Sequence, residues 1–261
     1  MRWVAHPFHI VTPSPWPVLV SFGCFFMVVM GLEYINGGSI FMFLVSFSLV
    51  CLLSFQWWRD VIREGTFQGA HTEEVQTGIR LGVVLFITSE LMFFFSFFLS
   101  FFYLSLSPDI WLGMNWPPVG VLPVNWLGVP LLNTLILLSS GISVTWAHHG
   151  LMGKNLSAGV IGLTLTVILG MIFILFQAME YYESSFSMPD SSFGSIFYLS
   201  TGFHGLHVLI GSVFLMVGLI RLGNKHMSNS HHLGFESAAW YWHFVDVVWL
   251  ILFLCFYWWG S

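Results

Sequence analysis

The sequence predicts an all-α membrane protein whose helices cross the bilayer seven times. Of its 261 residues, 57% are apolar, 18% are aromatic and only 7% are charged, which is more apolar material than a soluble core of this length requires. Long apolar runs alternate with short polar breaks, and each run reaches or approaches the roughly 20 residues that a helix needs to cross about 30 Å of hydrocarbon. The expected spans are residues 16–34, 39–57, 76–104, 130–148, 157–179, 194–220 and 238–258.

The charged residues assign the connections between these spans to two sides of a membrane. All seven Lys and Arg residues fall before the first span or around the second, fourth and sixth connections: Arg2, Arg59, Arg63, Arg80, Lys154, Arg221 and Lys225. The other connections contain neither residue and form an acidic rim, with Glu33, Asp109, Glu180, Glu183 and Asp190. Because cationic loops stay on one side of a membrane, the pattern predicts an odd number of spans and termini on opposite sides.

The elements follow in order along the chain. Residues 1–15 are rich in proline, which disfavours a helix interior, and should form an arm along the cationic surface. Residues 16–72 should hold the first two helices, joined by a tight turn at residues 36–38, and residues 73–261 should hold the other five. The second connection places tryptophan beside arginine over residues 56–64, which marks the depth of lipid head groups.

Two later segments carry packing signals. The third connection, about residues 105–129, is rich in tryptophan and proline, which predicts an ordered loop at the membrane interface. In the fifth span, small residues recur every four positions, at Ala158, Gly162, Thr166 and Gly170. A stripe of this kind lets a neighbouring helix approach closely.

Eleven histidines raise the question of a metal site. The pairs at residues 148–149 and 231–232, with His204 and His207 three residues apart, superficially resemble the histidine boxes of membrane di-iron hydroxylases. Those boxes cluster on one face of the membrane, whereas here the spaced pair has no third histidine and lies at another depth. The Glu-x-x-His pattern of bundle di-iron sites is absent too. We therefore expect no metal on this chain, although haem ligation stays open.

Glu90 is an acid expected inside a span. It lies ten residues beyond Arg80, about 15 Å along a helix axis, which places it near mid-membrane. An ionised carboxylate among phenylalanines is costly there, so a polar partner is expected. His207, about 21 Å from Arg221 along its own helix, is the expected partner, with His204 as the alternative. The pair is either a proton-handling group or a buried hydrogen bond.

A third group, Glu236, His243 and Asp246, falls in the last span. His243 and Asp246 are three residues apart and share a helix face, with Glu236 two turns earlier on roughly the same stripe. Polar residues on one stripe of a span usually face another protein surface. With no nucleophile beside them, we expect an inter-helix polar lock and no catalytic residue.

Lipid contact is the best-supported chemistry of the cationic side. Guanidinium groups bind phosphodiesters bidentately, and tryptophan marks the interface. The residues concerned are Arg59, Arg63, Arg221, His71 and His226, with Trp57, Trp58 and Trp240. The pattern predicts retained phospholipid, with a charged collar that exchanges lipid freely as the alternative.

Long unusual strings carry a resemblance to a known family. They are Pro13 to Pro17, Gln56 to Glu64, Thr66 to Gly69, Trp116 to Pro118, Pro130 to Thr134, Thr145 to His149, Thr201 to Gly205, Ala238 to Trp249 and Tyr257 to Ser261. From Pro7 onward the chain is similar to subunit III of cytochrome c oxidase in its mitochondrial form. Departures include Ala70, where a second histidine is expected before His71, and Lys225, which is displaced by one position.

The resemblance implies a seven-helix fold in which a V-shaped phospholipid cleft separates two helices from five. It implies a non-catalytic core subunit of a proton-pumping terminal oxidase that passes electrons from cytochrome c to oxygen. Haem a, haem a3 and copper would belong to subunits I and II, with subunit I as the main contact, accessory subunits around it and no nucleic acid. The subunit would lie in the inner mitochondrial membrane, with its N-terminus in the matrix and its C-terminus in the intermembrane space. It would stabilise the catalytic subunit and assist proton uptake or oxygen entry.

The same resemblance assigns particular residues. The lipid contacts would be Trp58, Arg63, Glu64, His71, Arg221 and His226, with cardiolipin among the candidate lipids. Glu90 and His207 match the buried acid and histidine of the family. The rival classes are a stand-alone membrane di-iron enzyme and a proton-coupled channel.

Overall fold

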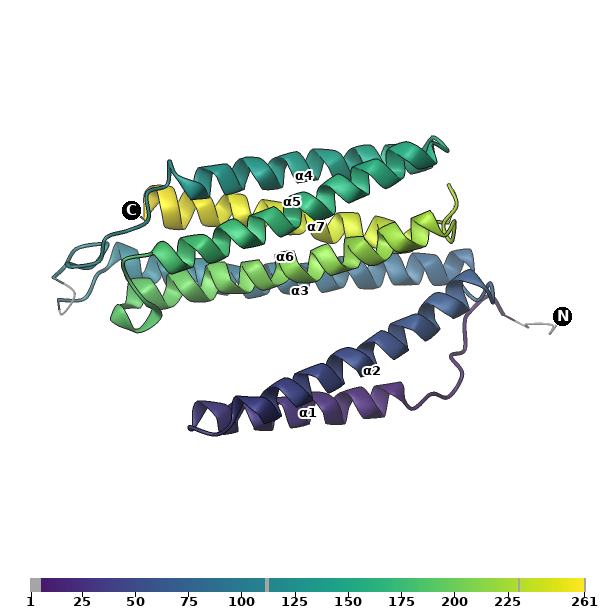
Figure 1. The fold of residues 1–261 in the computed structure, drawn as a ribbon, viewed down its shortest axis with the longest axis horizontal. Coiled ribbons are helices and arrows are strands. Elements are labelled where there is room, and N and C mark those ends of the chain that lie inside the picture. Colours follow the sequence, from purple (N-terminus) through teal and green to yellow (C-terminus); the bar gives the residue numbers. More distant parts are fainter. Residues whose placement is uncertain (1–5, 111–112, 230, 261) are drawn as a thin grey trace. The chain divides into compact units, whose positions relative to one another are not determined.

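The computed structural model describes residues 6–110, 113–229 and 231–260, and in these ranges the regular structure is helical (Figure 1). Seven helices in this described part are long and apolar enough to cross a membrane. They are α1 (Trp16–Ile35), α2 (Ile40–Thr66), α3 (Glu73–Leu106), α4 (Val129–Met152), α5 (Leu156–Glu183), α6 (Ser192–Gly223) and α7 (Leu233–Leu252). A π-helical segment, Phe253–Trp259, continues α7. The predicted all-α fold with seven spans is confirmed, whereas the V-shaped lipid cleft stays a prediction.

Several helices are longer than the apolar runs that predict them. The largest difference is in α2, which continues past the expected end at residue 57 to Thr66. Polar and aromatic side chains at the interface do not interrupt backbone hydrogen bonding, so the helix ends where the chain turns. The turn after α2 contains Gly69 with a φ of +64°, and the turn after α1 contains Gly37 with a φ of +90°. Both conformations favour glycine.

The chain forms two compact units, Met1–Ile79 and Arg80–Ser261. In the smaller unit, α1 and α2 pack as an antiparallel pair at Gly23, where an added Cβ would lie 3.3 Å from Val50 Cγ2. Within α1 and α2, which the structure describes in full, only Gly23 and Ser46 are buried. The apolar side chains of this pair therefore face outward, as expected of helices surrounded by lipid or by other subunits.

The N-terminal arm is held against the end of this helix pair by polar contacts. Thr72 Oγ1 donates a hydrogen bond of 2.6 Å to the carbonyl of Pro7. His9 Nε2 lies 3.3 Å from Glu64 Oε2, and Trp16 Nε1 donates to Asp60 Oδ2 at 2.7 Å. The described part of the arm thus lies along the same end of α2 as Arg59 and Arg63.

The larger unit is a bundle with an aromatic core. Helix α4 packs on α5 and α7, and α6 packs on the same two helices (Figure 1). Helix α3 joins them through ring contacts such as Phe101 with Phe256, whose centroids lie 4.1 Å apart. Large side chains fill the centre, among them the fully buried Trp242, Trp249 and Phe173.

The small-residue stripe of α5 lies at its contact with α4. A Cβ added at Gly162 would lie 2.9 Å from the carbonyl oxygen of Ser143 and 3.0 Å from the backbone nitrogen of Ala147. Thr166 Oγ1 and Ser143 Oγ form a buried hydrogen bond of 2.8 Å one turn further on. The α4–α5 pairing therefore depends on the absence of a side chain at residue 162.

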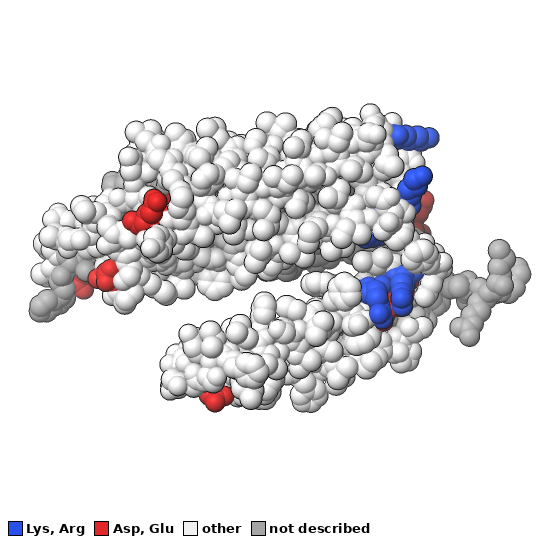
Figure 2. All heavy atoms as spheres, viewed as in Figure 1, with Lys and Arg blue, Asp and Glu red and all other residues white. Residues whose placement is uncertain are grey.

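The Lys and Arg side chains of the larger unit gather at one of its ends, as Figure 2 shows. Arg80 lies near the start of α3, Lys154 between α4 and α5, Arg221 in the last turn of α6 and Lys225 between α6 and α7. Because consecutive helices run in opposite directions, these four positions meet at one end of the bundle. Acidic residues at the ends of α3 and α5 and before α6 lie at the other end. The cationic connections that predict the spans thus lie together at one end of this unit.

Candidate functional site

Glu90 and His207 meet between α3 and α6. Glu90 Oε2 lies 2.9 Å from His207 Nε2, and the two side chains are 24% and 10% exposed. Aromatic rings surround the imidazole: Phe94 lies at 4.9 Å between centroids and Tyr241 at 6.2 Å. The acid and the histidine that were paired from their expected depths in the membrane are thus in contact, and their surroundings are apolar.

The hydrogen bonds of His207 fix how many protons this pair holds. His207 Nδ1 lies 2.6 Å from the carbonyl oxygen of Phe203, and because a carbonyl only accepts, Nδ1 carries a proton. A neutral imidazole then presents Nε2 as an acceptor, so Glu90 must donate to it. In the alternative state His207 is an imidazolium and Glu90 a carboxylate. Either way, one proton is shared across the 2.9 Å contact.

His204, the alternative partner of Glu90, belongs to a different contact. Its Nε2 donates to the carbonyl of Val245 at 3.2 Å, and its ring packs against Phe173 and Trp249. The side chain is 1% exposed, and its Nδ1 has no hydrogen-bond partner among the described residues. His204 is therefore a core residue between α6 and α7.

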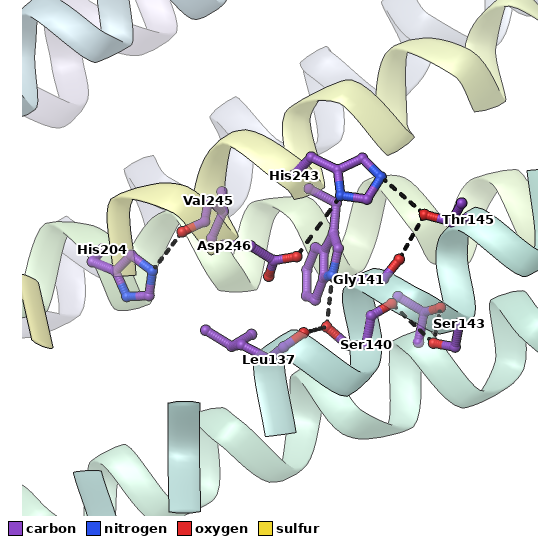
Figure 3. Close-up of polar contacts among 11 residues, drawn as sticks. Leu137, Ser140, Gly141, Ser143, Thr145, His204, His243, Val245 and Asp246 are labelled. Carbon is purple, nitrogen blue, oxygen red and sulfur yellow. Dashed lines mark hydrogen bonds and ion pairs between the residues drawn. The ribbon is translucent and has the colours of Figure 1, made fainter. Parts of the chain in front are cut away.

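The three polar residues of α7 contact two different helices. Glu236 accepts a hydrogen bond of 3.1 Å from Arg80 Nε, which ties α7 to α3. His243 Nε2 lies 3.4 Å from Thr145 Oγ1 on α4, and His243 Nδ1 lies 3.9 Å from Asp246 Oδ2 (Figure 3). These contacts suit an inter-helix lock, which stays a prediction, and the three residues do not form one network.

Two indole hydrogen bonds between α7 and α4 were missed by sequence reasoning. Trp242 Nε1 donates to Ser140 Oγ at 2.9 Å, and Trp249 Nε1 donates to Thr134 Oγ1 at 3.0 Å. The two tryptophans are seven residues apart, two helical turns on one face, opposite hydroxyl residues on α4. That spacing is the signal that could have found them.

Glu180 does not lie on a solvated acidic rim, as the sequence suggested, because its side chain is buried. It is 4% exposed, and its Oε1 accepts hydrogen bonds from Tyr257 at 2.7 Å and from Gln177 at 3.4 Å. Its Oε2 has no partner in the described ranges. Tyr257 belongs to the π-helical segment, so this bond ties the end of the chain to α5.

We expect Tyr257→Phe to destabilise the larger unit by about 1–3 kcal/mol, because it leaves the buried Glu180 carboxyl with only the long Gln177 bond. The measurement is the free energy of unfolding in detergent. Tyr241→Phe is the matched control, since Tyr241 is similarly buried but no hydrogen bond to its hydroxyl is found in the described part of the chain. Equal effects of the two variants would contradict the assignment.

The residues expected to contact lipid fall in both units. In the smaller unit, Trp58 is 65% exposed, and the Arg63 side chain is 58% exposed, with Nη1 3.8 Å from Asp60 Oδ1. Glu64 is engaged by His9, and the rings of His9 and His71 lie 6.3 Å apart. Of the four expected lipid contacts in the smaller unit, Trp58 and Arg63 are thus the most accessible.

The other two expected lipid contacts belong to the larger unit. Arg221 lies in the last turn of α6, and its carbonyl accepts the backbone N–H of His226 at 2.9 Å. A Cβ at Gly234 would lie 2.6 Å from Arg221 Nη1, so the guanidinium packs against the start of α7. Lipid contact by all six residues stays a prediction.

In the described residues, no group of three or more His, Cys, Asp or Glu side chains could hold a metal ion. Two histidine side chains of the described part do meet, because His148 Nε2 and His232 Nε2 lie 3.3 Å apart. His232 Nδ1 donates to the carbonyl of Ser228 at 3.1 Å, so His232 Nε2 is the acceptor of this pair when both rings are neutral.

These features define a polytopic α-helical membrane protein with a shared-proton pair inside its bundle and a cationic interface. A family profile described as Cytochrome c oxidase subunit III matches residues 6–261. The proteins named Cytochrome c oxidase subunit 3 from Prototheca wickerhamii and Heterololigo bleekeri are 55% and 54% identical to the chain. They match over 98% and 99% of the chain and over 98% and 100% of their own lengths. The chain belongs to the cytochrome c oxidase subunit III family.

Proposed function

We propose that this chain is a non-catalytic core subunit of cytochrome c oxidase, the proton-pumping enzyme that passes electrons from cytochrome c to oxygen. It stabilises the catalytic subunit I and holds phospholipid, cardiolipin included, at its cationic interface. Haem a, haem a3 and copper belong to subunits I and II, and accessory subunits complete the assembly. The chain lies in the inner mitochondrial membrane, with its N-terminus in the matrix and its C-terminus in the intermembrane space.

The observation that carries lipid retention is the cationic end of the α1–α2 pair. Exposed apolar side chains cover both helices, so hydrocarbon or another subunit must surround them. At the end of α2, Trp58 and Arg63 are exposed, and tryptophan beside arginine is typical of the depth of lipid head groups. A guanidinium with only a distant carboxylate beside it retains donors for a phosphodiester.

We expect Arg63→Gln to weaken phospholipid retention by the assembled oxidase about fivefold, because a cation near an anionic surface contributes roughly 1 kcal/mol. The measurement is the phospholipid content of the purified complex during stepwise detergent washing. Lys154→Gln is the control, because it removes one positive charge between α4 and α5, outside the predicted lipid contacts. Equal lipid loss in the two variants would show that the cationic end acts only as a general charged collar.

A second role, assistance of proton uptake, is favoured by one observation. Glu90 and His207 share a proton in a largely buried contact, and a pair of this kind can take up or release a proton without moving the backbone. The experiment that separates this role from a structural one is a substitution of Glu90 that keeps the hydrogen bond and removes the proton.

A further inference from the structure

We propose that the outward face of α4 and α7 around His243 and Asp246 is an intramembrane docking site for a transmembrane helix of another subunit. The incoming helix presents a side chain with at least two N–H donors, such as an amide, an ammonium or a guanidinium. The proposal rests on the proposed function in one respect, that the chain works inside a larger assembly.

The depth of this face makes it unsuited to lipid. His243 and Asp246 lie about 15 Å and 20 Å along the axis from Leu233, the first residue of a helical stretch that ends at Trp259. Within the expected span 238–258, Asp246 therefore lies near the middle of the hydrocarbon, and His243 lies about 5 Å nearer the start of α7. The His243 side chain is nevertheless 46% exposed, and the apolar Ile142 on α4 and Val247 on α7 are 72% and 52% exposed. Acyl chains offer no hydrogen bonds to an imidazole at this depth.

The hydrogen bonds around His243 show which kind of group is missing. Thr145 Oγ1 donates to the carbonyl of Gly141 at 2.8 Å, so its contact with His243 Nε2 requires a proton on Nε2. In a neutral imidazole Nδ1 is then an acceptor, and across 3.9 Å it faces Asp246 Oδ2, which is also an acceptor when the carboxyl is ionised. That separation is too long for a hydrogen bond. A group with two N–H donors can serve both atoms.

The backbone opposite Asp246 is shaped to accept this carboxyl. A Cβ at Gly141 would lie 2.7 Å from Asp246 Oδ2, so only glycine leaves room for the side chain between α7 and α4. Asp246 is 7% exposed, and its Oδ1 has no partner in the part of the chain that the structure describes. Figure 3 shows the imidazole of His243 and the hydroxyl of Thr145 pointing toward one another beside this carboxyl.

The first experiment maps what covers the face. Val247→Cys in the assembled oxidase is coupled to a photoactivatable cross-linker, and the products are identified by mass spectrometry. We expect one other subunit, cross-linked through a helix that carries an amide or cationic side chain. Leu175→Cys on α5, which is 67% exposed, is the matched control and should give a different product pattern. Products confined to lipid, or to a second copy of this chain, would overturn the proposal.

The second experiment tests the recognition chemistry. His243→Phe and Asp246→Asn should each lower the Val247 cross-link yield about three- to fifteenfold, the range that single interhelical hydrogen bonds in membranes span. The helical signal of each purified variant is the folding control. A yield unchanged in both would refute donor recognition. If the unaltered chain fails to co-purify with an oxidase, the proposed function fails; if it co-purifies but Val247 reaches only lipid, the docking site alone fails.

Discussion

Gly162→Ala is expected to lower the free energy of unfolding of the larger unit by about 3 kcal/mol, at the upper end of overpacking costs. The added Cβ would meet the Ser143 carbonyl at 2.9 Å and the Ala147 nitrogen at 3.0 Å. These are backbone atoms, so no rotamer change on α4 can relieve the contact, and α4 and α5 must move apart. That movement also stretches the buried hydrogen bond between Ser143 and Thr166. Gly162→Val should prevent accumulation of the folded chain altogether.

The matched control is Gly202→Ala on α6, where an added Cβ has no atom within 4 Å. This substitution removes the same glycine flexibility from a helix and should be neutral or slightly stabilising. Detergent unfolding of both purified variants, followed by circular dichroism, gives the two free energies. If Gly162→Ala proves as stable as Gly202→Ala, the α4–α5 pairing does not depend on direct backbone contact at residue 162.

The number of spans was predictable because the thickness of the hydrocarbon sets how many consecutive apolar residues a helix needs to cross it. Apolar runs of the required length and the alternation of cationic connections are both properties of the chain read in order. Helix ends were less predictable: α2 reaches Thr66, nine residues beyond its expected end, because Trp58 to Arg63 leave the hydrocarbon without leaving the helix. Hydropathy locates the edge of the membrane, whereas the chain turn near Gly69 locates the end of the helix.

The Glu90–His207 contact could be anticipated because both depths were counted from cations at the same end of the bundle. Depth alone left His204 open as a partner, and only the rotation of α6 excludes it by turning that ring toward Val245. The reading of Glu236, His243 and Asp246 as one stripe of α7 stays a prediction. Which neighbouring helix each residue contacts depends on tertiary packing. Glu236 accepts a hydrogen bond from α3, whereas His243 contacts α4.

Glu180 shows why a charged residue near the end of a span can be misplaced. Its position suggested a solvated rim, yet its partner Tyr257 lies 77 residues away in the π-helical segment. No local pattern connects a carboxyl on α5 with a phenol near the end of the chain. Burial of a polar group close to the interface is therefore set by what covers it, and sequence depth does not give that information.

Glu90→Leu is expected to destabilise the larger unit by about 1–3 kcal/mol, the cost of leaving a buried polar group without its partner. His207 Nε2, which lies near the rings of Phe94 and Tyr241, would lose its hydrogen bond to residue 90, while Nδ1 keeps its bond to the carbonyl of Phe203. Glu90→Gln should cost less than about 0.5 kcal/mol, because the amide N–H can donate to Nε2 in place of the carboxyl. Detergent unfolding of the two variants measures this difference.

The same two variants separate the structural role of the pair from a role in proton uptake. Glu90→Gln keeps the hydrogen bond but contributes no exchangeable carboxyl proton, so a relay through Glu90 predicts slower proton uptake by the assembled oxidase at unchanged stability. The rate is followed by stopped-flow measurement of pH in reconstituted vesicles, with the unaltered oxidase as reference. Uptake that is unchanged in Glu90→Gln would exclude the relay. The stability loss confined to Glu90→Leu would then identify the pair as a hydrogen bond that holds α3 against α6.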